Sequence, residues 1–418
     1  MSKENESGLL KDIRTRIKKS CLLLGVNEDY YRFLSKVQKT VVVSLPLMRD
    51  NGELEMYKGY LAEHATIMGP AKGGLRISPD ITQEDIQAFA IKNSFKSALI
   101  GLPLSGGKTA IKADPRILSN KEIERLVRRF TASIINQIGP DKHILSPELN
   151  TDEQTMAWVA DTYSMGMGKP KFHVCTGKPP EMGGIIGRDK AVGWGVGYIL
   201  KYYANRKNED IRSRSIAIQG IGHVGRSAAI IGQEYGAKIV AISDKSCGVY
   251  KPEGLDLIDV INYKKKNGQL KGYPRAEIIT NKELLSLKVD VLIPCATHDQ
   301  ITKDNADDIN ARLILEGANG PITMDADDIL DERKVPIIPD IIANTGGIIA
   351  SYFEWVNDLS QLRWSADRIA RELEHIIVDA FARVYDKRHK DAISYREAAY
   401  ELAIQRLVKA IEFRGIYP

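Results

Sequence analysis

Long apolar runs are missing from this 418-residue sequence, and no segment approaches the length needed to cross a membrane. An excess of one charge is missing as well, because 59 basic residues stand against 54 acidic ones and the formal net charge is only +5. The basic residues are scattered, so we expect neither nucleic acid nor a membrane surface as a partner. The apolar run at residues 21–24 is too short for a secretion signal, which favours a cytoplasmic protein.

Cysteine is also scarce. The four cysteines, Cys21, Cys175, Cys247 and Cys295, lie far apart in the sequence, with no CxxC pair and no metal-ligand spacing. The histidines show no such spacing either. We therefore expect no metal site, and we predict buried, unreactive thiols in a reducing compartment such as the cytosol.

The length and composition indicate a protein with ample core. Hydrophobic residues make up 43% of the chain and charged residues 27%, and this length predicts two or three domains. Residues 1–185 mix expected helices, such as 9–25 and 120–138, with short strands, such as 40–47. The segment 175–188 is rich in glycine and proline and is typical of a connector.

The following part of the chain alternates short apolar strands with helices. Helices are expected over 191–204 and 226–237, and strands at 216–218, 238–244, 289–294, 311–318 and 334–340. This alternation predicts a parallel sheet covered by helices on both faces. We therefore expect an α/β protein of two domains, an N-terminal α/β domain over 1–185 and a Rossmann-like domain over 186–350. An amphipathic helix over 366–387 and the rest of 351–418 are expected to pack back on the first domain.

Residues 101–115 read GLPLSGGKTAIKADP and contain Gly107-Lys108-Thr109, the ending of a phosphate-binding P-loop. A P-loop needs a glycine at position 102, which is Leu102 here. No clear strand leads into the segment. The pattern therefore favours a glycine turn that carries a lysine over an ATP or GTP site.

A second glycine pattern, Gly220-x-Gly222-x-x-Gly225, lies between an expected strand and an expected helix. In that context the glycines allow a tight turn and close approach of the backbone to a pyrophosphate. Asp244 ends the next strand, where an acid can bind the ribose hydroxyls and repel a 2′-phosphate. The pattern predicts NAD or NADP as cofactor and favours NAD, although Lys245 could pair with a phosphate. A tight turn without ligand is the alternative.

Three lysines precede this region: Lys72 in MGPAKGGLRISP, Lys96 in IKNSFKSAL and Lys108. Taken singly, each is more typical of a solvated surface lysine. Taken together, cations in glycine-lined turns could bind two carboxylates and leave one amine for chemistry. A lysine that is desolvated among other cations has a lowered pKa, which suits a general acid or base.

The ordered motifs of the chain resemble those of the glutamate/leucine/phenylalanine/valine dehydrogenases, with the closest likeness to archaeal glutamate dehydrogenases. They run from about residue 40 to 418 and include GPAKGGLR, LPLSGGKTAIKADP, NTDEQTMAW, TGKPPEMGG, QGIGHVG, EGANGPIT and PDIIANTGGIIASYFEW. The resemblance implies reversible oxidative deamination of L-glutamate to 2-oxoglutarate and ammonia with NAD or NADP. It also implies a homohexamer, with a substrate-binding and oligomerisation domain, a cofactor domain and a cleft between them.

The resemblance implies a role for each lysine. Lys108 matches the catalytic lysine, which activates the water that attacks the iminium. Lys96, together with Asn344, matches the residues that bind the substrate α-carboxylate. Lys72, together with Ser351, matches the pair that binds the side-chain carboxylate. This pair favours glutamate as substrate, because a buried ammonium that faces an apolar side chain is costly.

The cofactor residues that the resemblance implies surround the glycine pattern. One is an arginine beside the cofactor, and another is an asparagine near the nicotinamide. The full expected set is Arg188, Val192, Gly220, Gly222, His223, Val224, Gly225, Asp244 and Asn319.

Four departures from the family pattern lie near these residues. Glu148, in SPELNT, stands where the family has its catalytic aspartate, and we expect it to shuttle protons as ammonia leaves. Thr109 and Ala110 stand where two glycines are usual. Val192 replaces a threonine that holds the nicotinamide carboxamide, and His223 replaces an asparagine. Misplacing a catalytic group by about 1 Å can cost on the order of 100-fold in rate.

These departures leave two alternatives to an efficient glutamate dehydrogenase. One is a catalytically weakened paralogue that acts as a binding or regulatory subunit beside an active relative. The other is an amino-acid dehydrogenase with a different substrate. His223 has its own alternative, a turn residue whose ring lies in solvent.

Overall fold

The computed structural model describes residues 8–416 of the chain, which divides into two compact units. The first unit consists of Met1–Ile186, Ala350–Ala366 and Tyr400–Pro418, and the second of Gly187–Ile349 and Asp367–Ala399. Each unit has one β-sheet with helices packed against it, so the α/β class expected from the sequence is confirmed. Within residues 8–416, no helix has the length and apolarity needed to cross a lipid bilayer.

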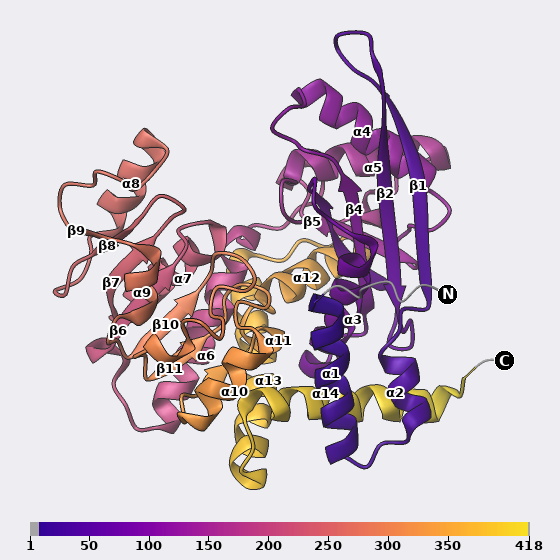
Figure 1. The fold of residues 1–418 in the computed structure, drawn as a ribbon. Helices are drawn as coiled ribbons and strands as arrows, with labels where there is room; N and C mark the ends of the chain where they lie inside the picture. Colours follow the sequence, from indigo (N-terminus) through magenta and orange to yellow (C-terminus); the bar gives the residue numbers. More distant parts are fainter. Residues whose placement is uncertain (1–7, 417–418) are drawn as a thin grey trace. The chain divides into compact units, whose positions relative to one another are not determined.

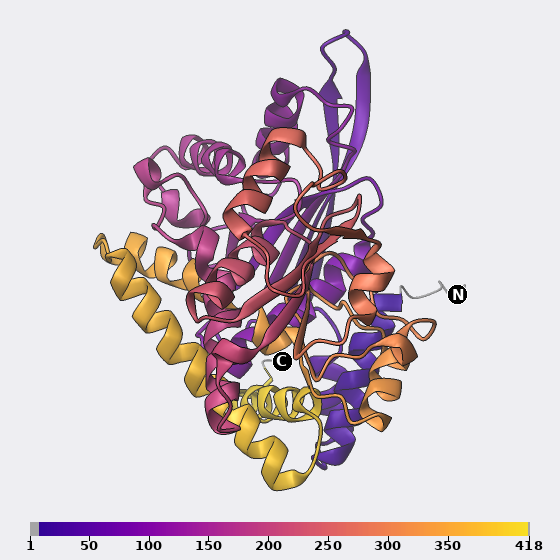
Figure 2. The ribbon, with the colours of Figure 1, turned by 90° about the vertical axis from the view of Figure 1, so that its left-hand side faces the viewer.

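The sheet of the first unit has five strands in the order β1-β2-β4-β3-β5. Strand β2 is antiparallel to β1 and β4, whereas β3 is parallel to β4 and β5. The strands are β1 Lys39–Met48, β2 Leu54–His64, β3 Ala71–Ile77, β4 Ser105–Lys112 and β5 His143–Pro147. The hairpin of β1 and β2 extends beyond the other strands of this sheet (Figure 1 and Figure 2).

Helices pack against both faces of this sheet. Adjacent residues of β4 belong to two separate apolar clusters, Ala110 to one with α3 (Gln83–Ile100) and Ile111 to one with α4 (Asn120–Ser133) and α5 (Glu153–Met167). Helix α3 begins at a capping box and ends at a glycine with a φ of 81°. The two N-terminal helices of this unit are α1 Gly8–Leu23 and α2 Glu28–Leu34.

The sheet of the second unit has seven strands in the order β12-β11-β10-β6-β7-β8-β9. The strands from β12 to β7 are parallel, whereas β8 and β9 add an antiparallel edge that the sequence pattern did not predict. Their bounds are β6 Ser215–Gln219, β7 Lys238–Ser243, β8 Gly248–Tyr250, β9 Glu277–Ile279, β10 Val291–Pro294, β11 Leu313–Leu315 and β12 Ile337–Ile338. The strand order reverses between β6 and β10, and ligands of such sheets bind at the carboxyl ends of the strands at this point.

The remaining helices are α6 Ala191–Arg206, α7 His223–Glu234, α8 Leu257–Asn267, α9 Asn281–Ser286, α10 Met324–Glu332, α11 Asp340–Ala343, α12 Gly346–Ser360, α13 Ala366–Asp391 and α14 Tyr395–Arg414. The domain boundaries expected from the sequence stay a prediction, and the compact units differ from them because residues 367–399 group with the second unit. Within that unit, Phe381 of α13 packs edge-on against Tyr202 of α6, with ring centroids 5.7 Å apart.

Two glycine pairs that the sequence assigns to turns lie inside strands, Gly73-Gly74 in β3 and Gly106-Gly107 in β4. They allow close approach, because a Cβ on Gly73 would lie 1.8 Å from the carbonyl oxygen of Gly107. A Cβ on Gly106 would lie 1.9 Å from a backbone oxygen of α3. The expected lysine-bearing turn is therefore wrong, and so is a P-loop, because Lys108 lies within a strand between two others.

Replacing Gly73 by alanine should destabilise the first unit, because the new methyl group would overlap the backbone of β4. We expect the free energy of unfolding to fall by about 3 kcal/mol, the upper end of the range for overpacking, as measured by urea denaturation. Gly8→Ala is the matched control, since no atom lies within 4 Å of its Cβ position. Equal stability of the two variants would contradict this explanation.

Candidate functional site

The three lysines singled out in the sequence are all buried in the first unit. The exposed fractions of Lys72, Lys96 and Lys108 are 6%, 4% and 4%, so the alternative of solvated surface lysines is wrong. Lys72 lies opposite Gly106 on a parallel strand, and side chains alternate between faces, so Lys72 and Lys108 share one face of the sheet. Helix α3, which carries Lys96, packs on this same face.

The Lys108 ammonium lies between a carboxylate and an aromatic ring. Its Nζ is 3.2 Å from Oε2 of Glu148 and 5.0 Å from the ring centroid of Phe89 on α3. Burial lowers the pKa of Lys108; Glu148 opposes this effect, and Arg76 adds to it. The net pKa is below the ordinary lysine value, which brings the amine closer to the range of a general acid or base.

Glu148 is held by Arg76, a residue that the sequence analysis did not single out. The Arg76 guanidinium donates two hydrogen bonds of 2.6 Å, one to each carboxylate oxygen, and lies 4.8 Å from the Phe89 ring centroid. Burial alone would raise the pKa of Glu148, but Lys108 and Arg76 hold it far below its usual range. The only sequence signal for this contact is the arginine that ends GPAKGGLR.

The residues after Lys108 occupy packing positions in the sheet. Thr109 alternates to the face opposite Lys108 and is fully buried, and its hydroxyl donates a hydrogen bond of 3.3 Å to the backbone oxygen of Gly74. Ala110 lies opposite Arg76 on β3 and belongs to the cluster under α3. The Thr109 side chain therefore faces away from Lys108, whereas Ala110 lies on the same face as Lys108 and packs under α3.

Ser351 lies on α12 and is 2% exposed. One turn later, Glu354 accepts hydrogen bonds of 2.8 Å from the Gly177 N–H and from Nζ of Lys178. The same Nζ donates a hydrogen bond of 2.7 Å to Asp358. The glycine and proline content of residues 175–188 predicts only a connector and does not indicate this buried ion cluster.

The cysteines are buried and none forms a disulfide within residues 8–416, as the sequence predicts. Burial raises the pKa of Cys21 to about 11 and that of Cys175 and Cys295 to about 12. Lys72 pairs with Ile144 of β5, and the next residue, Leu145, forms a bridge with Cys175, so Lys72 lies near the segment 175–178 that binds Glu354 of α12.

In the second unit, the glycine turn after β6 has the geometry of a phosphate site. Gly220 has a φ of 96°, and a Cβ on Gly225 would lie 1.8 Å from the backbone oxygen of Gly220. Gly222 caps the N-terminus of α7, and no atom lies within 4 Å of its Cβ position. This open space at a helix N-terminus fits a pyrophosphate. His223 is exposed at the first residue of α7, and Val224 beside it is half-buried.

The Asp244 carboxylate, expected at the ribose, is already engaged by a neighbouring loop. It accepts hydrogen bonds of 2.7 Å from Nζ of Lys264 and from the Ser246 N–H, and one of 2.9 Å from the Leu270 N–H. Burial opposes ionisation, but these donors lower the pKa of Asp244 to about 2. A ribose hydroxyl would have to displace one of them, so ribose binding by Asp244 stays a prediction.

Asn344, expected at the substrate, and Asn319, expected at the cofactor, form a hydrogen bond beyond the ends of β11 and α11. The Asn344 amide donates hydrogen bonds of 3.2 and 3.1 Å to the backbone oxygens of Gly317 and Ala318, and one of 3.1 Å to Oδ1 of Asn319. Val192 lies in the first turn of α6, 3.2 Å from the Cβ position of Gly347. Arg188 lies in the short 3-10 turn that precedes α6.

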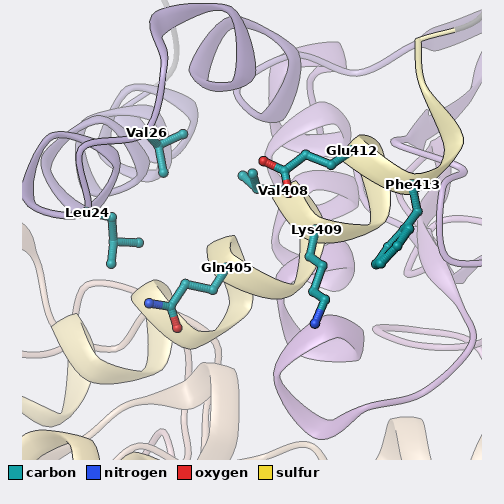
Figure 3. A pocket seen from close by; sticks show the side chains of 7 residues that line it. All are labelled: Leu24, Val26, Gln405, Val408, Lys409, Glu412 and Phe413. Carbon is teal, nitrogen blue, oxygen red and sulfur yellow. The ribbon is translucent and has the colours of Figure 1, made fainter.

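A separate pocket of about 410 Å³ in the first unit contains none of the expected site residues (Figure 3). Leu24 and Val26 line one side, and Gln405, Val408, Lys409, Glu412 and Phe413 of α14 line the other. Its three polar side chains are exposed to solvent. The pocket therefore lacks the buried polar groups that fix a ligand.

Replacing Lys178 by methionine should destabilise the protein strongly, because it leaves the Glu354 and Asp358 carboxylates buried without their cation. We expect a loss of about 3–5 kcal/mol in the free energy of unfolding, measured by denaturant titration. Lys387→Met is the matched control, because it removes an ion pair with Asp391 one turn along the same helix. The Asp391 side chain is 36% exposed, and such a pair contributes about 0.5 kcal/mol to the free energy of unfolding. Similar losses in the two variants would contradict the assignment.

Asp244→Asn should lower stability at neutral pH by about 1–2 kcal/mol, because the folded protein stabilises the carboxylate form. Since the folded pKa is about 2 and the ordinary value is about 3.9, this stabilisation is complete above about pH 4. It should disappear as the pH falls toward 2, so denaturation curves of wild type and variant should converge there. Asp210→Asn, at an exposed pair with Arg212, should show little difference at any pH.

Comparison with known proteins supports the family resemblance that the sequence motifs indicate. Residues 37–165 match the Glu/Leu/Phe/Val dehydrogenase dimerisation domain, and residues 183–415 match the Glutamate/Leucine/Phenylalanine/Valine dehydrogenase domain. The chain is 41% identical to a glutamate dehydrogenase of Thermotoga maritima, over 99% of this chain and 100% of that protein. It is 40% identical to the NAD-specific glutamate dehydrogenase A of Halobacterium salinarum, over 100% of this chain and 95% of that protein.

A solved structure shows a similar fold along the whole chain. The hetero-hexameric glutamate dehydrogenase of Thermus thermophilus, in its leucine-bound form, matches with a TM-score of 0.95 and 34% identity. The match covers 100% of this chain and 99% of that one. With both domain matches and full-length relatives in agreement with the site geometry, this chain belongs to the Glu/Leu/Phe/Val dehydrogenase family.

Proposed function

We propose that this protein catalyses the reversible oxidative deamination of L-glutamate to 2-oxoglutarate and ammonia, with NAD as hydride acceptor. Its full-length relatives from Thermotoga maritima and Halobacterium salinarum are glutamate dehydrogenases, and the second is NAD-specific. The observation that carries the proposal is the burial of Lys72, Lys96 and Lys108 on one side of a sheet, with Glu148 beside Lys108.

Two of the lysines would bind the substrate carboxylates. Lys96, with Asn344, binds the α-carboxylate, and Lys72, with Ser351, binds the side-chain carboxylate. Burial supports this assignment, because a desolvated ammonium gains most from an anionic partner. A dicarboxylic amino acid supplies one carboxylate for each lysine, whereas leucine, valine and phenylalanine supply only one.

The second unit would hold the cofactor. The turn from Gly220 to Gly225 fits the pyrophosphate. Arg188 would lie beside the cofactor, and Asn319 would lie near the nicotinamide, where Val192 takes the place of the threonine that holds the carboxamide in the family. The negative charge of Asp244 disfavours a 2′-phosphate, which favours NAD over NADP. When bound, NAD supplies the acceptor for the hydride that leaves the substrate α-carbon.

Lys108 would carry the hydrolytic step. Once the α-carbon has become an iminium carbon, the neutral Lys108 amine takes a proton from the water that adds to it. The protonated amine, stabilised by Glu148, then returns this proton to the substrate nitrogen. As the carbon–nitrogen bond breaks and ammonia leaves, the again neutral amine takes the proton of the new hydroxyl group, so that the carbonyl of 2-oxoglutarate forms. Burial of the site favours this cycle because it keeps the lysine pKa low.

We also propose that the protein is a cytoplasmic homohexamer. A hexameric neighbour of similar fold supports the assembly. That neighbour is a hetero-hexamer, which supports a second candidate function, a weakly active subunit of a mixed hexamer. The departures at Glu148 and Val192 from the family pattern point the same way.

Tested alone, the purified protein should reduce NAD in the presence of glutamate and show little activity with leucine, valine or phenylalanine. Lys108→Ala should lower kcat by about 10²–10⁴-fold, the contribution of a general acid–base group, while binding of NADH, followed by its nicotinamide fluorescence, is retained. Lys112→Ala, at the exposed end of the same strand, should leave kcat unchanged. Activity that survives in Lys108→Ala contradicts the assignment, and a wild type active only when mixed with a relative supports the second candidate.

A further inference from the structure

Glu148 is attached to β3 through its backbone as well as its side chain. Its N–H donates a hydrogen bond of 2.7 Å to the hydroxyl of Thr151, and that hydroxyl donates one of 2.8 Å to the backbone oxygen of Leu75. The Asn150 amide donates one of 2.9 Å to the backbone oxygen of Ile77. The acid is therefore fixed on the strand that carries Arg76.

The Glu148 side chain has little freedom to move between partners. Arg76 binds both carboxylate oxygens at 2.6 Å, and Lys108 lies 3.2 Å from one of them. Phe89 lies within 5.0 Å of both cations and limits their movement from the α3 side. Gly74 makes room for the acid, since a Cβ there would lie 2.7 Å from Cβ of Glu148.

We infer that Arg76 is a positioning residue that keeps Glu148 as a fixed carboxylate beside Lys108. This inference rests on the proposed function and changes the part assigned to Glu148, which the sequence led us to expect as a proton shuttle. A carboxylate bound on both oxygens by a guanidinium is a weak base. Its contribution is a fixed negative charge that steadies the Lys108 ammonium.

The longer side chain of Glu148 fits this arrangement. A bidentate guanidinium contact defines the position of a carboxylate more tightly than a single ammonium contact. The bidentate contact with Arg76 thus fixes the position of the Glu148 carboxylate despite the extra methylene in its side chain. Arg76 also brings a positive charge close to Lys108, and this charge favours the neutral amine.

Lys72 shares a face of the sheet with Lys108, and α3, which carries Lys96, packs on that face. The groups that act on the pKa of Lys108 are Glu148, which follows β5, and Arg76 of β3. Helix α3 contributes the Phe89 ring, and its Asp85 acts on Arg76. On β2, Ala62 pairs with Lys108. A change at Arg76 or Glu148 should therefore dominate the titration of this amine.

The test is the titration of Lys108 by cyanate, which reacts with neutral amines, across a pH series. Peptide mass spectrometry gives the modification of Lys108 relative to Lys121, an internal reference on the surface helix α4. Arg76→Gln should move the Lys108 midpoint up by about one pH unit, because a neighbouring cation is lost. Glu148→Gln should move it down, because the neighbouring anion is lost. Arg128→Gln, on α4, should leave it unchanged.

The conservative variant Arg76→Lys distinguishes the effect of the positive charge from the effect of the two-point contact with Glu148. Arg76→Lys keeps the positive charge but not the two-point contact, so its Lys108 midpoint should stay near that of wild type. Its kcat should fall by about tenfold or more with KM for glutamate unchanged, because the carboxylate is less well placed. Wild-type kcat in Arg76→Lys would overturn the positioning role.

An unchanged or lowered Lys108 midpoint in folded Arg76→Gln would overturn the inference. If Arg76→Gln fails to fold, an unchanged Lys108 midpoint in Glu148→Gln would overturn the inference. The labelling needs no turnover, so an inactive wild type would contradict the proposed function without deciding the role of Arg76.

Discussion

The close pairing of β3 and β4 is the constraint on which the first unit depends. Gly73 and Gly107 bring the two backbones together at a distance that excludes a Cβ. On the face toward α3, small residues alternate with long cations, so that Lys72, Arg76 and Lys108 fit under the helix. The glycines therefore serve to place charge in the interior rather than to turn the chain.

Buried charges of this kind need partners, and the structure supplies them locally. Glu148 lies between Arg76 and Lys108, and the Glu354 carboxylate binds Lys178 and two backbone N–H groups. Removing one partner from such a group costs more than the pair contributes, because the remaining charge stays desolvated. This coupling ties the stability of the first unit to the residues proposed for catalysis and substrate binding.

The departures from the family pattern differ in which groups their side chains contact. Thr109 and Ala110 are buried packing residues of β4, Thr109 on the face away from Lys108 and Ala110 in the apolar cluster under α3. Glu148 contacts the Lys108 ammonium directly, and its bidentate contact with Arg76 gives its longer side chain a defined position. In the second unit, Asp244 binds Lys264 of α8 and the backbone of the loop that follows this helix.

The sequence by itself determined the α/β class and the glycine turn of the second unit, and it singled out the three lysines that the structure buries, because periodicity and motif spacing are local properties of a chain. It could not show that Gly73 and Gly107 lie within strands, since a glycine pair is equally compatible with a turn. It also could not show that Arg76 binds Glu148 or that Lys178 binds Glu354, because these partners are separated by 72 and 176 residues. Only the tertiary structure decided these contacts, since the pairing of distant strands and the docking of α12 bring the charges within hydrogen-bonding distance.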